Sequence, residues 1–186
     1  TQFLVAGGVT CYESLTPERI AEFEGLYKEV NDFVNQVYIP DLLLVGGAYK
    51  DWTKIGGTAN FMTFGEFPGD ERNLESRWFK PGVVFDRKLE ALPFDPSKIE
   101  EHVRHSWYAG DAVHKPFQGV TEPKFTFMGD KDRYSWMKAP RYDGRAVETG
   151  PLAQVLVAYL KGNAEVVPVV DSVLQTLSLT PGDLFS

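Results

Sequence analysis

The sequence contains very little cysteine and no long apolar run, and these absences exclude several classes of protein. Cys11 is the only cysteine among 186 residues, so the chain forms no internal disulfide and carries no C-x-x-C metal-binding motif. No apolar stretch reaches the roughly 18 residues that a membrane-spanning helix needs. The first residues show no basic region followed by an apolar one, so we expect no signal peptide there.

Positive charge is also sparse. The chain has 19 Lys and Arg against 26 Asp and Glu, which gives a net charge of −7. The cations are scattered along the sequence, so we predict no local basic patch and no nucleic-acid partner. The hydrophobic share of 43% is instead ordinary for a globular protein, with one core or two small lobes.

Apolar residues recur at helical spacing in four segments. The helices predicted from this periodicity are residues 17–38, 41–52, 151–160 and 165–177. Thr16-Pro17 is a typical helix start, and Pro40 is expected to break or kink the chain between the first two helices.

Strand signals are short and separated by turns. Residues 2–9 are predicted to form a strand and turn, and 61–64 and 83–85 are strand candidates. Residues 97–100 read Ser-Lys-Ile-Glu, a capping box that predicts one or two helical turns. A helix start at Thr180-Pro181 is followed by only a few residues, so we expect a piece of a longer chain.

The segment 134–153 has a more distinctive composition than an ordinary surface loop. Its Lys138 lies among aromatic and apolar residues. This setting predicts partial burial of the side chain, which costs free energy unless an acid accompanies the ammonium. Glu100, Glu101 and Glu148 are the nearest acids in the two distinctive segments, 100–108 and 134–153. In the alternative, Lys138 and Arg141 extend from an aromatic shelf into solvent.

Other reactive residues have ordinary explanations. The spacing of His102, His105 and His114 matches no metal motif, so hydrogen-bonded histidines are the favoured interpretation. Cys11 is interpreted as a small buried residue. Residues 130–132 read Asp-Lys-Asp and are interpreted as a solvated turn, because the rest of a calcium loop is missing.

Eight segments, in matching order, resemble the large subunit of nickel-iron hydrogenases, most closely the periplasmic, cytochrome-c-linked uptake type. They are Val9-Thr-Cys-Tyr12, Tyr38-Ile-Pro-Asp-Leu42, Ala48-Tyr-Lys-Asp-Trp52, Phe64-Gly-Glu-Phe67, Phe79-Lys-Pro-Gly-Val83, Glu101-His-Val103, Ser106-Trp-Tyr108 and the block from Tyr134 to Ala153. The resemblance covers nearly the whole chain. It implies a mainly helical fold with a few short peripheral strands, and residues 1–186 as a single partial domain, an internal fragment of that subunit.

The resemblance also implies a chemistry: reversible oxidation of dihydrogen to protons and electrons at a nickel-iron centre. That family holds its metals with four cysteines in two C-x-x-C pairs, near the two ends of the complete subunit. Neither pair lies in this sequence, and the ligands of the family's magnesium site also lie outside it, so no catalytic residue, cofactor ligand or metal ligand is carried over. The isolated fragment is expected to be inactive.

What this stretch supplies, on the same resemblance, is scaffold and outer shell. Lys138 and Glu101 are the candidates for hydrogen bonds to waters or ligands near the metals. Arg141 and Glu148 are expected to be structural, as an ion pair that fixes the loop before helix 151–160. The implied partners are an iron-sulfur small subunit and, indirectly, a c-type cytochrome, and the implied location is the periplasm.

Two other interpretations stay open. One is a metal-free relative on the same fold, of the type of the quinone-site subunit of respiratory complex I. The other is an aromatic-rich binding module, since 13% of the residues are aromatic and four are Trp.

Overall fold

A computed structural model describes residues 4–5, 8–9, 16–70, 72–110, 113–116 and 121–185. The chain divides into two compact units, residues 1–50 and 51–186, and each is described by itself. Cys11 lies outside the described residues, so its burial stays a prediction. No helix in the described ranges is long and apolar enough to cross a membrane.

The first unit begins with a small hairpin. Strands β1 (Leu4–Val5) and β2 (Gly8–Val9) pair in antiparallel register, with Leu4 opposite Val9. The predicted strand is confirmed for these four residues, and the predicted turn lies outside the described residues.

A continuous helical segment follows the hairpin. Helix α1 (Pro17–Phe33) begins at Thr16, whose Oγ1 accepts a hydrogen bond from the backbone N–H of Arg19 at 3.4 Å. A π-helical turn, η1 (Val34–Tyr38), leads directly into α2 (Ile39–Ala48). None of the residues in these three elements is buried.

Of the break or kink predicted at Pro40, the break is not observed, and the π turn explains why. Proline has no N–H to donate to the preceding turn of an α-helix, and its ring crowds the carbonyl there. The backbone N–H of Ile39 donates instead to the carbonyl of Val34, five residues back, so the wider turn comes just before Pro40. The helix therefore continues to Ala48, and a 3-10 turn, η2 (Lys50–Lys54), replaces the end of the predicted second helix.

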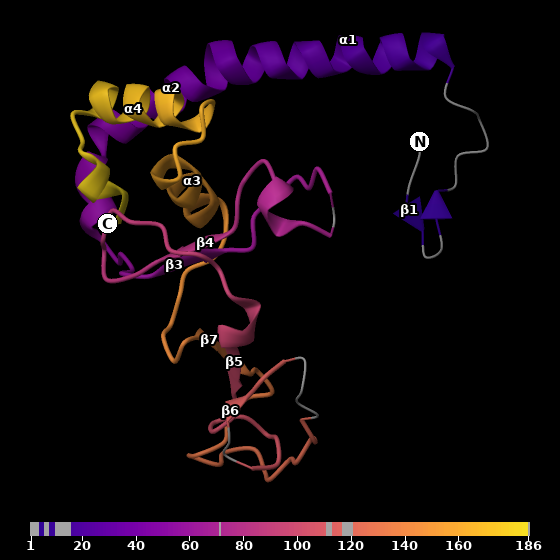
Figure 1. Cartoon of the computed structure of the whole chain (residues 1–186), viewed down its shortest axis with the longest axis vertical. Helices are drawn as coiled ribbons and strands as arrows, with labels where there is room; N and C mark the ends of the chain where they lie inside the picture. Colours follow the sequence, from indigo (N-terminus) through magenta and orange to yellow (C-terminus); the bar gives the residue numbers. More distant parts are fainter. Residues whose placement is uncertain are drawn as a thin grey trace. The chain divides into compact units, whose positions relative to one another are not determined.

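The second unit has its main core between a strand pair and a helix. Strands β3 (Phe61–Thr63) and β4 (Gly82–Val84) pair in antiparallel register, and α3 (Pro151–Leu160) lies beside them (Figure 1). The buried residues of this core come from all three elements and the C-terminal turn: Phe61, Val84, Ala153, Leu156, Val157 and Phe185. Both predicted strands and the predicted helix 151–160 are confirmed.

Helix α4 (Val166–Leu177) and three 3-10 turns also belong to this unit. Its buried face, Val166, Val170 and Leu174, packs on Ala158 of α3. The predicted helix 165–177 is therefore confirmed, with its first residue one position later. The 3-10 turns are η3 (Leu74–Ser76), η4 (Pro96–Lys98) and η5 (Pro181–Phe185).

A three-stranded antiparallel sheet, which the sequence did not predict, carries the candidate site. Its order is β6 (Val113–His114), β5 (Ile99–His102) and β7 (Ala139–Tyr142). The predicted helical turn is present as η4, but the predicted capping box is not formed. Asp95, not Ser97, caps the turn, and its side chain accepts from the backbone N–H of Ser97 at 2.9 Å. The chain is then extended from Ile99 onward.

Candidate functional site: two glutamates on opposite faces of one strand

The centre of the candidate site is the pair of adjacent glutamates on β5, Glu100 and Glu101. Successive side chains of a strand point to opposite faces of its sheet, so the two carboxylates face different surroundings. Each meets a lysine from a different neighbouring segment: Lys115 follows β6, and Lys138 precedes β7. One strand thus holds two separate ion pairs, one on each face.

Lys138 pairs with Glu101, one of the three acids that the sequence offered. The Lys138 Nζ lies 2.9 Å from Glu101 Oε2, and the two side chains are 28% and 24% exposed. Glu101 stands opposite Pro140 in the register of β5 and β7, which makes Lys138 its diagonal neighbour on the same face. The ammonium also lies 5.3 Å from the centre of the Tyr108 ring. The predicted partial burial of Lys138 beside an acid is confirmed, and extension into solvent is not observed.

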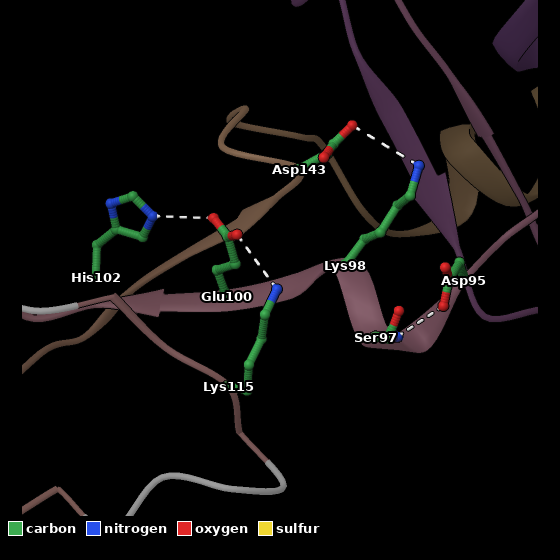
Figure 2. A network of polar contacts seen from close by, with 7 residues as sticks. All are labelled: Asp95, Ser97, Lys98, Glu100, His102, Lys115 and Asp143. Carbon is green, nitrogen blue, oxygen red and sulfur yellow. Dashed lines mark hydrogen bonds and ion pairs between the residues drawn. The ribbon is translucent and has the colours of Figure 1, made fainter.

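Glu100 is held by two cationic or polar partners on the other face, as Figure 2 shows. Its Oε1 lies 3.3 Å from Lys115 Nζ, and its Oε2 lies 3.3 Å from His102 Nε2. The hydrogen bond with His102 and then the interaction with Lys115 hold the pKa of the Glu100 carboxyl below its usual value. Nearby, Lys98 reaches Asp143 at 3.8 Å, between the start of β5 and the end of β7.

The two segments that the sequence singled out lie against each other beyond the sheet. The backbone N–H of Trp107 donates to the carbonyl of Ser135 at 2.9 Å, and the Ser106 hydroxyl donates to the carbonyl of Met137. Arg133 also joins the two segments, because its Nη1 donates to the carbonyls of Ser106 and Tyr108, each at 2.6 Å. These bonds fix Lys138 relative to β5.

The histidines are hydrogen-bonded where the structure describes their side chains. His102 contacts Glu100, and His105 Nδ1 lies 2.9 Å from the carbonyl oxygen of Asp132. Since a carbonyl oxygen only accepts, Nδ1 of His105 is the protonated nitrogen. The ordinary interpretation is confirmed for these two residues, while the side chain of His114 lies outside the description.

The predicted turn at residues 130–132 is also confirmed. Asp130 Oδ1 accepts from the backbone N–H of Asp132 at 2.9 Å, and its Oδ2 accepts from the Thr126 hydroxyl at 2.6 Å. These bonds, led by the one from Thr126, lower the pKa of the Asp130 carboxyl.

The donor set of this part of the chain does not fit a nickel-iron centre. Such metals are suited to soft thiolate ligands. The described residues contain no cysteine, and no group of three or more His, Cys, Asp or Glu among them is placed to hold a metal ion. The described residues therefore supply no ligand set for nickel or iron.

An open groove of about 410 Å³ borders the Lys138 pair. Its basic lining residues come from two distant stretches of sequence: His102, Arg104, His105, Lys138 and Arg141. The prediction of no local basic patch does not hold for this lining, because Arg104 and Arg141, far apart in sequence, both border the groove.

The expected ion pair between Arg141 and Glu148 is not formed within the described ranges. Arg141 stands opposite Glu100 in the sheet register, and its Nη1 donates to the carbonyl of Pro140 at 2.7 Å. Glu148 instead uses its backbone, which bonds to Asn60 and to Met62 of β3. The loop before α3 is therefore held by main-chain bonds to the β3 segment, which periodicity and charge could not reveal.

Comparison with known proteins gives this geometry its context. A family model described as nickel-dependent hydrogenase matches residues 1–186. The chain belongs to the nickel-dependent hydrogenase family. The resemblance inferred from the eight sequence segments is thereby confirmed.

Individual hydrogenases match over nearly all of this chain. Hydrogenase-1 large chain of Escherichia coli (strain K12) is 32% identical, over 94% of this chain and 35% of that protein. Uptake hydrogenase large subunit of Rhizobium leguminosarum bv. viciae is 31% identical, over 98% and 36%. The solved Ni-Fe-Se hydrogenase of D. vulgaris Hildenborough in its as-isolated oxidized state aligns with a TM-score of 0.68 and 31% identity, over 96% of this chain and 42% of that one.

The chain spans little more than a third of the length of these two curated relatives. At the coarse level, the structure agrees with the predicted fold class in having helices and a few short strands. Within the second unit, however, β3 and β4 lie in the core and not at its surface.

Proposed function

We propose that the protein to which these residues belong is the catalytic large subunit of a nickel-iron hydrogenase, which oxidises dihydrogen reversibly to protons and electrons. The observation that carries this proposal is the family match along all 186 residues, together with relatives named as hydrogenase large chains. The match to a nickel-dependent family favours this function over a metal-free relative and over an aromatic-rich binding module.

Within that subunit, this stretch is scaffold for the metal centre. The nickel-iron centre is bound by cysteines outside residues 1–186, and a magnesium ion, where present, is also bound from outside. Sequencing the parent reading frame in both directions tests this directly. Two C-x-x-C pairs, one on each side, are expected, and a frame without them would leave a metal-free relative as the better answer.

Lys138 and Glu101 form the part of the scaffold closest to the chemistry in this proposal. The 2.9 Å ion pair is partly buried, braced by the Tyr108 ring, and opens onto the basic groove. In that position the ammonium would donate to waters or ligands around the metals, and such outer groups orient the ligands themselves.

The matched lysine on the other face of β5 allows a controlled test. In the complete enzyme, Lys138→Met is expected to lower metal content or hydrogen turnover, while Lys115→Met, which removes the partner of Glu100, leaves both near the parent values. Lys138→Arg should restore part of the loss, because it keeps the charge. Unchanged metal content and turnover in Lys138→Met would remove the proposed role.

The remaining assignments follow from the same proposal. The large subunit pairs with an iron-sulfur small subunit, passes electrons through it towards a c-type cytochrome, and works in the periplasm, as in the uptake type. Co-purification of the two subunits from a periplasmic fraction is the expected result. Recovery only from the cytoplasmic fraction would contradict the location while leaving the reaction in place. The isolated residues 1–186 are expected to show no hydrogen turnover.

A further inference from the structure

The two arginines of the groove lack an acidic partner in the part of the chain that the structure describes. Arg104 is exposed and forms no ion pair with a described residue. Arg141 Nη1 donates a hydrogen bond to the carbonyl of Pro140. None of the residues lining the groove is acidic. The groove therefore presents two guanidinium groups without an ion pair to a described residue, while its Lys138 is paired with Glu101 and its His102 with Glu100.

Two large and exposed side chains, one aromatic and one apolar, also line the groove. Tyr134 and Met137 both line it and are 64% and 77% exposed. The His105 ring is stacked on Tyr134 with 5.8 Å between ring centres, and its Nδ1 is already committed to the Asp132 carbonyl. A cationic centre with exposed aromatic and Met side chains around it is typical of a surface that another polypeptide segment covers. A site for a small inorganic anion needs no exposed aromatic and Met side chains beside it.

A covering segment must also satisfy the guanidinium groups. Removing water from an arginine is costly unless other acceptors replace the lost hydrogen bonds, and a carboxylate also balances the charge. Guanidinium and carboxylate groups match each other in shape and can form two parallel hydrogen bonds. The two guanidinium groups of the groove therefore favour an Asp or Glu side chain as the contact.

We propose that the groove between Arg104 and Arg141 binds an acidic segment from the remainder of the catalytic subunit, outside residues 1–186. This source is favoured because the curated relatives have nearly two thirds of their length beyond the stretch that this chain covers. The inference rests on the proposed function in one respect, namely that the chain is part of such a subunit. It adds to that function a specific contact that joins this scaffold to the rest of the subunit.

Zero-length cross-linking in the complete two-subunit protein tests the contact. Arg104→Lys and Arg141→Lys keep the positive charge and place a primary amine in the groove, which a carbodiimide joins to a carboxylate in direct contact. Mass spectrometry then identifies the acidic residue. Arg145→Lys is the matched control, because Arg145 Nη1 lies 2.9 Å from Asp86 and its lysine should cross-link to that residue.

The expected result is a cross-link from at least one groove lysine to an Asp or Glu of the catalytic subunit outside residues 1–186. A cross-link to an acid within residues 1–186, or to the iron-sulfur subunit, overturns the proposed occupant. Absence of any cross-link from the groove, with the Arg145→Lys product formed, overturns the contact itself. Hydrogen oxidation by the same complexes is measured separately, so that loss of the proposed function and loss of the contact are distinguishable.

Discussion

At the residue scale, adjacent glutamates on β5 receive different environments because of strand geometry. Glu101 shares a partly buried pair with Lys138, whereas Glu100 is held by His102 and Lys115. The sequence could indicate that Lys138 needs an acid, but three glutamates were equally available. The choice between them depends on the register of β5 with β7, which aligns Glu101 with Pro140.

Glu100 should make the stability of the chain depend on pH in a defined window. Its carboxyl pKa is below the ordinary value of 4.5 in the folded state, so its stabilising contribution is complete above that value. It is lost as the pH falls through the lower, folded-state pKa. Thermal melting of Glu100→Gln and the parent should therefore differ near neutral pH and converge in acid. A difference between Glu100→Gln and the parent that stays constant with pH would contradict this assignment.

Gly65 occupies a backbone conformation and a space that only glycine fits. It has φ of +78°, and an added Cβ would lie 2.3 Å from the carbonyl oxygen of Phe79. Gly144 has a similar φ of +73° but nothing within 4 Å of that position. Gly144→Ala should lower the free energy of unfolding by about 1–2 kcal/mol through backbone strain alone. Gly65→Ala should cost about 1–3 kcal/mol more, because the clash adds to the strain. Urea unfolding measures both, and equal losses would show that the space at Gly65 is not constrained.

At the scale of elements, periodicity predicted the helices well and the three-stranded sheet β6-β5-β7 not at all. Helices α3 and α4 carry several apolar residues at three- and four-residue spacing, so the pattern is distinctive. The strands of this three-stranded sheet have two to four residues each, too few for an alternating pattern to be recognised. Asp95 as the cap of η4 was missed for a similar reason, because Ser97 offered a competing capping signal two residues later.

Helix α3 should contribute to stability mainly through its buried face. Leu156 is fully buried against β3 and β4, whereas Leu152 on the same helix is 38% exposed. Leu156→Ala should lower the free energy of unfolding of the second unit by about 2–5 kcal/mol, the range for a buried leucine. Leu152→Ala should cost clearly less. Urea denaturation followed by circular dichroism decides this, and similar losses for the two variants would contradict the assigned core.

At the scale of the whole molecule, the apolar surface of the first unit has the features of a part that packs against more protein. No residue of α1, η1 or α2 is buried, and large side chains on α1 are open, among them Phe23 at 68% and Tyr27 at 63%. Exposed apolar surface of this extent usually marks an interaction site. Sequence periodicity predicted these helices but could not show what their apolar residues contact.

The isolated chain should therefore bind an apolar fluorescent dye and self-associate as its concentration rises. The complete subunit with its partner should do neither to the same degree, because the same residues would be covered. Dye titration and sedimentation of both proteins at matched concentration provide the comparison. Two-state melting of a monomeric, dye-free chain would instead favour an independent binding module.

The central claim is that these residues belong to the catalytic subunit of a nickel-iron hydrogenase. The most direct measurement is hydrogen-dependent reduction of an artificial electron acceptor by the complete protein, purified under anaerobic conditions. The account predicts acceptor reduction that requires dihydrogen and is absent from the isolated chain. A complete, folded and metal-loaded protein that reduces no acceptor under dihydrogen would contradict it.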